Sequence, residues 1–145
     1  MFKAITNLKE APAGYPLCFN HQCAHCPKCL HYQTALANPP QKKYGRVVYP
    51  FAWAEGECKS FAPAELQELA WGFNNLYEKL SVEQQHEARA RLRYYFSAGM
   101  STYYRYHHGE CVLSLKRQKD VLDIMSDYGD RNQFSFDHYV SLLRF

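Results

Sequence analysis

The chain has 145 residues with a net charge of +3, and 47% of its residues are hydrophobic, which excludes a disordered chain and allows a buried core. Its first residues contain Lys3, Lys9 and Glu10 and lack the apolar run of a secretory signal, and no stretch approaches the roughly 18 apolar residues of a membrane span. We therefore expect a cytoplasmic protein with a single domain, 1–145, that does not bind membranes.

The N-terminal part of the chain, 1–61, is rich in cysteine and in loops. Its sequence LHYQTALAN predicts a short helix over residues 30–38, because two prolines follow that cannot continue it. Residues 46–49 predict a strand. This part is expected to need a metal ion for its fold.

The remainder, 62–145, is predicted to be helical. A long helix is expected to begin at Pro63 and to reach Leu80, because apolar residues recur at intervals of three and four. Gly72 lies inside this predicted helix, where it costs roughly 1 kcal/mol relative to alanine, and it allows a close approach by a neighbouring element.

Further elements follow in chain order. The sequence Ser81-Val82-Glu83-Gln84 is a capping box that predicts a second helix, ended by Gly99 and antiparallel to the first. Residues 102–114 predict a β-hairpin. A third long helix is expected to begin at Ser114 and to end at Gly129, and a last short helix is expected to begin at Phe136. The expected fold class is mainly α: a small helical domain with a cysteine-rich, metal-binding N-terminal segment and a short β-hairpin.

Four cysteines fall within twelve positions, 18–29, and Cys58 follows some thirty residues later. Thiolates are soft, anionic ligands, and four of them satisfy the tetrahedral preference of zinc. Since the thiols of a cytoplasmic protein stay reduced, the pattern favours a structural zinc site over disulfides, which an exported chain would form instead. The candidate ligands exceed the needs of one ion: Cys18, Cys23, Cys26, Cys29 and Cys58, with His21, His25 and His31 as further candidates.

Two other interpretations of the cysteines remain open. The spacing Cys18-x4-Cys23-x2-Cys26 with the distant Cys58 matches the pattern of a plant-type two-iron cluster. The loop, however, lacks the small residues that let backbone amides approach the sulfurs of such a cluster. The remaining alternative is a set of free, partly buried thiols without a metal.

These motifs together resemble an uncharacterised family of small bacterial proteins, a domain of unknown function. The matching features are LCFNHQCAHCPKCL, a later Cys58 followed by Phe61, and YYRYHHGECVLS before a helix ending in DYG. The resemblance implies a site of four thiolates, Cys18, Cys23, Cys29 and Cys58, with Cys26 as an alternative ligand. It implies no activity.

Positive charge is concentrated in residues 89–119, where seven Arg and Lys face Glu110 alone. Tyrosines interleave with these cations, and aromatic faces can stack on unpaired bases while arginines meet phosphates. We therefore consider a surface for nucleic acid or another partner, and the alternative is that acidic and basic segments pair with each other. The candidate residues are Arg89, Arg93, Tyr103, Tyr104, Arg105, Tyr106, Lys116, Arg117 and Lys119.

Catalysis is not expected, because the adjacent histidines and Cys111 of the 102–114 segment lack a third, orienting group. The sequence therefore predicts a non-enzymatic, zinc-stabilised binding module, with nucleic acid as the first candidate partner. An adaptor that binds an unidentified protein is the alternative. An iron–sulfur electron-transfer protein is the third hypothesis.

Overall fold

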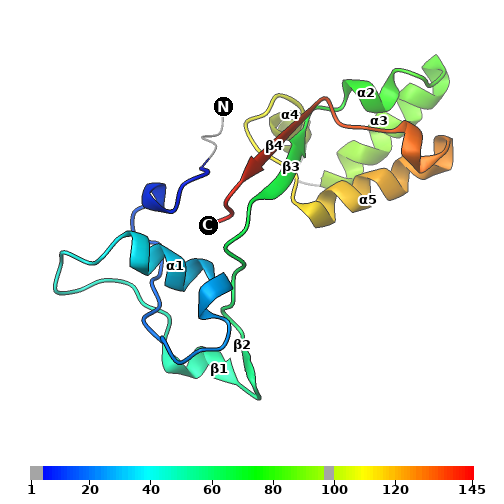
Figure 1. Cartoon of the computed structure of the whole chain (residues 1–145). Coiled ribbons are helices and arrows are strands. Elements are labelled where there is room, and N and C mark those ends of the chain that lie inside the picture. Colours follow the sequence, from blue (N-terminus) through cyan, green and yellow to red (C-terminus); the bar gives the residue numbers. More distant parts are fainter. Residues whose placement is uncertain (1–4, 97–99) are drawn as a thin grey trace. The chain divides into compact units, whose positions relative to one another are not determined.

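The computed structural model describes residues 5–96 and 100–145, and the chain divides into two compact units. The helical unit is the described part of Glu68–Ser141, and the N-terminal unit combines residues 5–67 with Leu142–Phe145. Figure 1 shows α1 and the β1–β2 hairpin in the N-terminal unit, and helices α2 to α5 in the helical unit. Gly99, where a helix end is predicted, lies outside the described residues.

The N-terminal unit contains α1 (Leu30–Ala37), which confirms the helix predicted over 30–38. Asn38 ends α1, and its side-chain amide donates hydrogen bonds to the carbonyls of Thr34 (3.1 Å) and Leu8 (2.8 Å). The strand predicted over 46–49 is wrong. Within the described residues Val47 forms only an isolated parallel bridge with Leu17, so no neighbouring strand extends the ladder.

A hairpin that was not predicted carries the last cysteine of this unit. β1 (Trp53–Ala54) pairs antiparallel with β2 (Glu57–Cys58), and the register places Trp53 opposite Cys58. The two turn residues, Glu55 and Gly56, have φ values of 55° and 81°. Positive φ at both central residues matches the twist of a two-residue hairpin.

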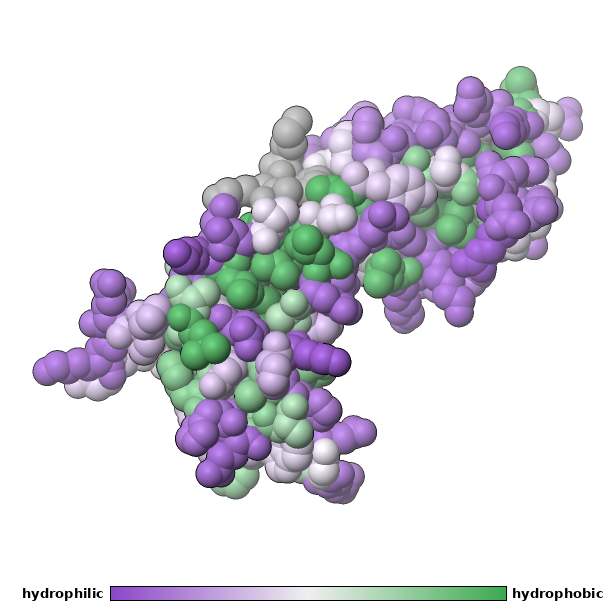
Figure 2. Space-filling view, viewed as in Figure 1, coloured by the Kyte–Doolittle hydropathy of each residue, from purple (hydrophilic) through white to green (hydrophobic). Residues whose placement is uncertain are grey.

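The core of the N-terminal unit is small. Among its described residues only six side chains are buried: Cys29, Leu30, Thr34, Ala35, Leu142 and Leu143. Large apolar side chains instead remain exposed, with Tyr44 88%, Tyr49 72% and Phe51 94% accessible. Figure 2 shows hydrophobic and polar side chains intermixed on the visible face of this unit. Apolar burial alone therefore contributes little to its stability.

The long helix predicted from Pro63 to Leu80 is wrong. β3 (Gln67–Trp71) is a strand, and only the four residues of α2 (Asn74–Tyr77) are helical. β3 pairs with β4 (His138–Leu142), so the last short helix predicted from Phe136 is also wrong. The indole of Trp71 stacks on the His138 ring at the end of this sheet, with ring centroids 3.9 Å apart.

Gly72 explains why β3 and α2 do not fuse into one helix. Its φ of 86° lies in the left-handed region, which an α-helix excludes. The carbonyl of Gly72 accepts from the Asp137 amide (3.1 Å), and its amide donates to the Tyr106 carbonyl (3.1 Å). A Cβ at this position would lie 2.6 Å from the Asp137 side chain. The close approach expected at Gly72 is therefore present, but at a strand end.

α3 (Val82–Phe96) begins where the capping box predicts. The Gln84 amide donates to Ser81 Oγ, and the Ser81 amide donates to Gln84 Oε1, both at 3.2 Å. The helix buries Ala88, Leu92 and Phe96. The start and the inner face of this helix are thus confirmed, whereas its predicted antiparallel partner, the long helix from Pro63, is absent from the described residues.

The hairpin predicted over 102–114 is wrong, because this segment begins in α4 (Met100–His107). Tyr103, Tyr106 and His107 recur at intervals of three and four and pack inward on one helix face. Gly109 has a φ of 76° and follows the helix, and the Glu110 amide donates to the Arg105 carbonyl (2.9 Å). This pairing is a Schellman motif, so Gly109 ends a helix and does not form a hairpin turn.

α5 (Leu115–Met125) confirms the third predicted long helix. Ser114 Oγ accepts from the Arg117 amide (3.3 Å) as an N-cap, and a short 3-10 helix, Ser126–Tyr128, precedes Gly129. α3, α4 and α5 pack around one core, whose largest fully buried side chains include Phe73, Leu92, Tyr103, Leu113, Met125 and Phe136.

The mainly α fold class is therefore wrong, and the fold is a mixture of helices and two small two-stranded sheets. Two segments predicted as helices, 67–71 and 138–142, form the β3–β4 sheet. Their pairing joins residues about 70 positions apart, and helical spacing of apolar residues within either segment cannot reveal it.

Candidate functional site

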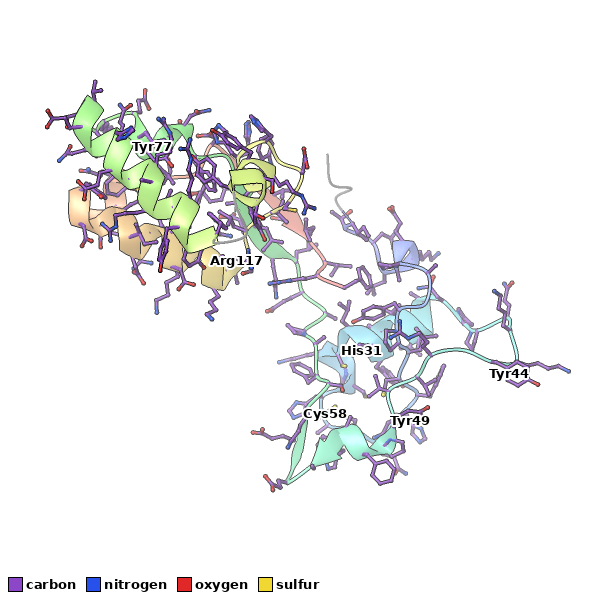
Figure 3. The ribbon with its side chains drawn as sticks, turned by 180° about the vertical axis from the view of Figure 1, so that it is seen from behind. His31, Tyr44, Tyr49, Cys58, Tyr77 and Arg117 are labelled. Atoms are coloured by element: carbon purple, nitrogen blue, oxygen red, sulfur yellow. The ribbon has the colours of Figure 1, made fainter. Side chains whose placement is uncertain are left out.

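Five cysteines, four from residues 18–29 and one from β2, line one pocket of the N-terminal unit. The pocket has a volume of about 540 Å³, and the cysteines that line it are Cys18, Cys23, Cys26, Cys29 and Cys58. Apolar and aromatic side chains complete the walls, among them Phe19, Tyr32, Val47, Trp53 and Phe61. Figure 3 shows Cys58 on β2 and Tyr49 on the segment that precedes β1. We call this site the cysteine pocket.

Local turns bring three of the cysteines to the pocket at regular intervals. The Cys26 amide donates to the Cys23 carbonyl (3.1 Å), and the Cys29 amide donates to the Cys26 carbonyl (3.3 Å). The 3-10 helix Cys26–Lys28 lies between them, with proline in its first turn. Each step of three residues is one turn of chain, and all three cysteines line the pocket.

The remaining two cysteines are positioned by long-range hydrogen bonds. The Cys18 amide donates to the carbonyl of His31 in α1 (3.2 Å), which holds the Cys18 segment beside the helix. Cys58 is fixed by the β1–β2 register, and its carbonyl accepts from the Phe61 amide (3.0 Å). Two backbone contacts, Leu30 N to Ala62 O (2.6 Å) and Ala64 N to Lys28 O (2.8 Å), tie the following segment to the cysteine turns.

The pocket holds free thiols. All six cysteines lie in the described residues and none forms a disulfide. In the part of the chain that the structure describes, no group of three or more His, Cys, Asp or Glu side chains is close enough together to hold a metal ion. The metal-binding part of the predicted fold class is corrected accordingly: the N-terminal segment forms a cysteine-lined pocket, in which Cys26 Sγ donates weakly to the His21 carbonyl (3.8 Å).

The candidate histidines are placed differently from the cysteines. His31 Nδ1 is 2.7 Å from the Pro16 carbonyl oxygen, and its ring stacks on Tyr15 at 4.7 Å. Burial, together with the nearby Cys29, raises the pKa of Tyr15 to about 12, so its hydroxyl stays protonated. The His25 ring lies against Phe61, with ring centroids 5.5 Å apart. His21, His25 and His31 are not among the residues that line the cysteine pocket.

The predicted basic residues and tyrosines all lie in the helical unit, on α3, α4 and α5. Arg117 packs over the Tyr106 ring (5.2 Å to its centroid) and donates to its hydroxyl (2.6 Å). Arg105 pairs with Glu110 at 3.6 Å, and Tyr103 is buried at 2% exposure. Figure 3 shows Arg117 and Tyr77 at separate places in this unit. Of these candidates, Tyr103 is therefore buried in the core, and Arg105 and Arg117 are engaged by neighbouring side chains.

Four of the nine residues line a second, polar cleft of about 250 Å³ in the helical unit: Arg89, Arg93, Tyr103 and Tyr104. Three further residues complete the cleft, and sequence reasoning missed them: Asn74, Tyr77 and His107. The sequence gives no signal for these three residues. It does indicate the two arginines of the cleft, because Arg89 and Arg93 are four positions apart and so lie on one face of α3. We call this site the arginine cleft.

Among the helices of residues 5–96 and 100–145, none has the length and hydrophobicity needed to cross a bilayer. No curated protein and no solved structure matches the chain. A protein family described as a family of unknown function, DUF6078, matches over residues 1–145. Because the match spans the entire sequence, this chain belongs to the DUF6078 family.

Proposed function

We propose that the protein is a non-enzymatic binding module of the bacterial cytoplasm whose N-terminal unit is stabilised by one zinc ion. The observation that carries the proposal is the convergence of five cysteines, from three separate chain segments, on one pocket. Thiolates are the ligands that structural zinc sites use most, and the four ligands proposed are Cys18, Cys23, Cys29 and Cys58. Cys26, whose thiol contacts the His21 carbonyl, is the alternative ligand.

The composition of the N-terminal unit supports a structural metal. With six buried side chains among its described residues, this unit gains little from apolar burial. Zinc binding contributes directly to folding in small domains of this kind, because the unfolded chain offers no preformed site. Four sulfurs about 2.3 Å from one ion also need far less space than the pocket provides.

Elemental analysis of the purified chain tests this proposal. We expect about one zinc ion per chain, and loss of most of it in Cys58→Ser, since a site with three thiolates binds zinc more weakly. Cys111→Ser is the matched control, because Cys111 belongs to the helical unit and should leave the zinc content unchanged. In a Trp71→Phe background, the remaining tryptophan is Trp53, which lines the pocket, so its fluorescence reports the N-terminal unit. After a chelator removes the metal, this unit should unfold at a lower temperature than before chelation.

The same measurement separates the alternatives. If the purified chain contains iron and inorganic sulfide and absorbs visible light, the site holds an iron–sulfur cluster and not zinc. That result would favour the electron-transfer hypothesis. A purified chain without metal, and without a change in unfolding on chelation, would remove the metal proposal altogether. Cys26→Ser adds a further distinction, because unchanged zinc content is expected if Cys26 is not a ligand.

We infer that the partner of the module is nucleic acid. The exposed cations near the start of α5, Lys116, Arg117 and Lys119, support this inference, since none of them takes part in an ion pair among the described residues. Three phosphate contacts to a single strand give a salt slope near −2, so binding should weaken roughly 15- to 20-fold between 50 and 200 mM salt.

Fluorescence anisotropy with a labelled single-stranded oligonucleotide measures this effect. Lys116→Gln with Lys119→Gln should weaken binding and reduce the salt slope, whereas Lys42→Gln, in an exposed loop of the N-terminal unit, serves as the control. Absence of binding at 50 mM salt would exclude nucleic acid. A discrete protein that co-purifies in that case would support the adaptor alternative.

A further inference from the structure

The arginine cleft combines two positive charges with neutral hydrogen-bond donors in a space of about 250 Å³. Its lining comes from three elements: Asn74 and Tyr77 from α2, Arg89 and Arg93 from α3, and Tyr103, Tyr104 and His107 from α4. These elements all belong to the helical unit, so the cleft is formed within one packed body. The charges come from side chains that aromatic rings hold in place.

Both guanidinium groups are fixed by cation–π contacts. Arg89 lies over the Tyr77 ring at 4.9 Å from its centroid, and Arg93 lies over Tyr103 (5.6 Å) and Tyr104 (5.7 Å). Arg93 also donates to the Tyr104 hydroxyl at 3.0 Å. Neither arginine takes part in an ion pair with a described carboxylate. Ring contacts therefore orient two charges that no acidic side chain neutralises.

Arg93 also carries an unsatisfied buried donor. Its Nε–H is buried and has no hydrogen-bond partner among residues 5–96 and 100–145. Buried donors are almost always paired in folded proteins, because an unpaired one loses its bond to water without replacement. The charge of Arg93 is therefore compensated neither by a bond at Nε nor by an ion pair within the described residues.

His107 presents a neutral donor to the same cleft. Its Nδ1 accepts the backbone N–H of Phe73 (3.1 Å), so in the neutral ring the hydrogen resides on Nε2. Burial lowers the pKa of His107, and the charges of His108 and Arg89 lower it further, whereas Asp137 opposes them. Asp137 is itself engaged, since its two carboxylate oxygens accept from the amides of Asn74 (3.0 Å) and Asn75 (2.7 Å).

We infer that the arginine cleft binds the phosphate group of a phosphate monoester. The cleft is smaller than the roughly 300–1,000 Å³ of pockets that enclose drug-sized ligands, so it fits one compact group. Two guanidinium charges match a dianion, and donors from both α3 and α4 suit a group with several acceptor oxygens. The inference does not depend on the zinc proposal, and it holds for a phosphorylated small molecule as well as for a phosphorylated strand end.

Titration calorimetry of the full chain with inorganic phosphate, against chloride at equal ionic strength, tests the site. We expect saturable binding that Arg93→Lys weakens at least about tenfold, because lysine lacks the planar guanidinium and its fixed fork of donors. Arg105→Gln is the matched control, since Arg105 is exposed on α4, pairs with Glu110 and does not line the cleft. Phosphate binding that is not saturable, or that is equally lost in Arg105→Gln, would overturn the inference.

A second variant tests the site even if Arg93→Lys fails to fold. His107→Asn keeps an acceptor for the Phe73 amide but removes the Nε2–H donor, so it should weaken phosphate binding while its thermal unfolding without phosphate stays near that of the native chain. If His107→Asn is folded and binds phosphate as tightly as the native chain, His107 does not face the ligand and the proposed site is wrong.

Oligonucleotides with and without a 5′-phosphate, together with a nucleoside monophosphate, identify the source of the group. Preference for the 5′-phosphorylated strand, lost in Arg93→Lys, would assign the cleft to strand ends. Binding of phosphate and the monophosphate without any strand binding would assign it to small molecules and refute the nucleic-acid proposal alone. Equal binding of both strands, unaffected by Arg93→Lys, together with no phosphate binding, would refute the cleft and leave the nucleic-acid proposal standing.

Discussion

Gly72→Ala should destabilise the helical unit by about 2–5 kcal/mol. Roughly 1–2 kcal/mol comes from placing a Cβ on a backbone with a φ of 86°. A further 1–3 kcal/mol is expected from overpacking, because the new methyl would lie 2.6 Å from Asp137 Cβ and Oδ2. The backbone cannot shift easily, since both the amide and the carbonyl of Gly72 are hydrogen-bonded, to Tyr106 and Asp137.

The measurement is urea unfolding of the full chain in a Trp53→Phe background, so that the fluorescence of Trp71 reports the helical unit. Gly56→Ala is a useful comparison, because its φ of 81° is similar but no atom lies within 4 Å of the added Cβ. It should show only the backbone part of the cost, read from Trp53 in a Trp71→Phe background.

A double-mutant cycle separates the two contributions at Gly72. In an Asp137→Gly background the steric overlap is gone, so Gly72→Ala should cost only about 1–2 kcal/mol more than Asp137→Gly itself. The cycle should therefore give a coupling energy of about 1–3 kcal/mol. A coupling energy near zero would show that Asp137 moves away freely, and would contradict the close packing of the two chain segments.

The elements that sequence reasoning predicts correctly are those defined by local hydrogen bonds. The Ser81–Gln84 box and the Ser114 N-cap join residues three positions apart, so their pattern is complete within one turn of chain. The helix over 30–38 is similarly set by Asn38 and the prolines after it. Such signals do not depend on what the element packs against.

The incorrect elements depend on partners far away in the sequence. In β3 the neighbouring residues Leu69 and Ala70 are both buried, so the strand lacks the alternation that identifies a half-exposed strand, and its apolar residues fit helical spacing. Its partner β4 begins at His138, which no local pattern links to β3. For α4 the tyrosines favoured a strand by propensity, whereas the spacing of Tyr103, Tyr106 and His107 favours the helix that forms.

The two candidate sites also differ in how far the local sequence reveals them. Four of the cysteines are neighbours in sequence, so their grouping is visible before the fold is known, and only Cys58 needs the β1–β2 register to reach the pocket. The arginine cleft is different, because His107 and Tyr77 come from elements that were predicted wrongly or too long. A hairpin at 102–114 would not have placed His107 beside α3.

Phe73→Ala should be the most destabilising core substitution in the helical unit, at about 3–5 kcal/mol. Phe73 is fully buried, and its ring centroid lies 5.1 Å from that of Tyr103, 5.7 Å from that of His107 and 6.4 Å from that of Phe136. Truncation removes a ring that contacts both α4 and the residues before β4. These surroundings are held by backbone hydrogen bonds, so the cavity cannot collapse fully.

Urea unfolding followed by Trp71 fluorescence measures this cost. Phe73→Leu, which keeps most of the volume, should cost roughly 1.5 kcal/mol or less, and Tyr94→Ala, at a side chain 86% exposed, should stay within about 0.5 kcal/mol. A cost below about 1.5 kcal/mol for Phe73→Ala would mean that the ring cluster does not hold the unit together. Because the Phe73 amide also fixes the tautomer of His107, a large cost accompanied by weaker phosphate binding would connect the packing of this core to the arginine cleft.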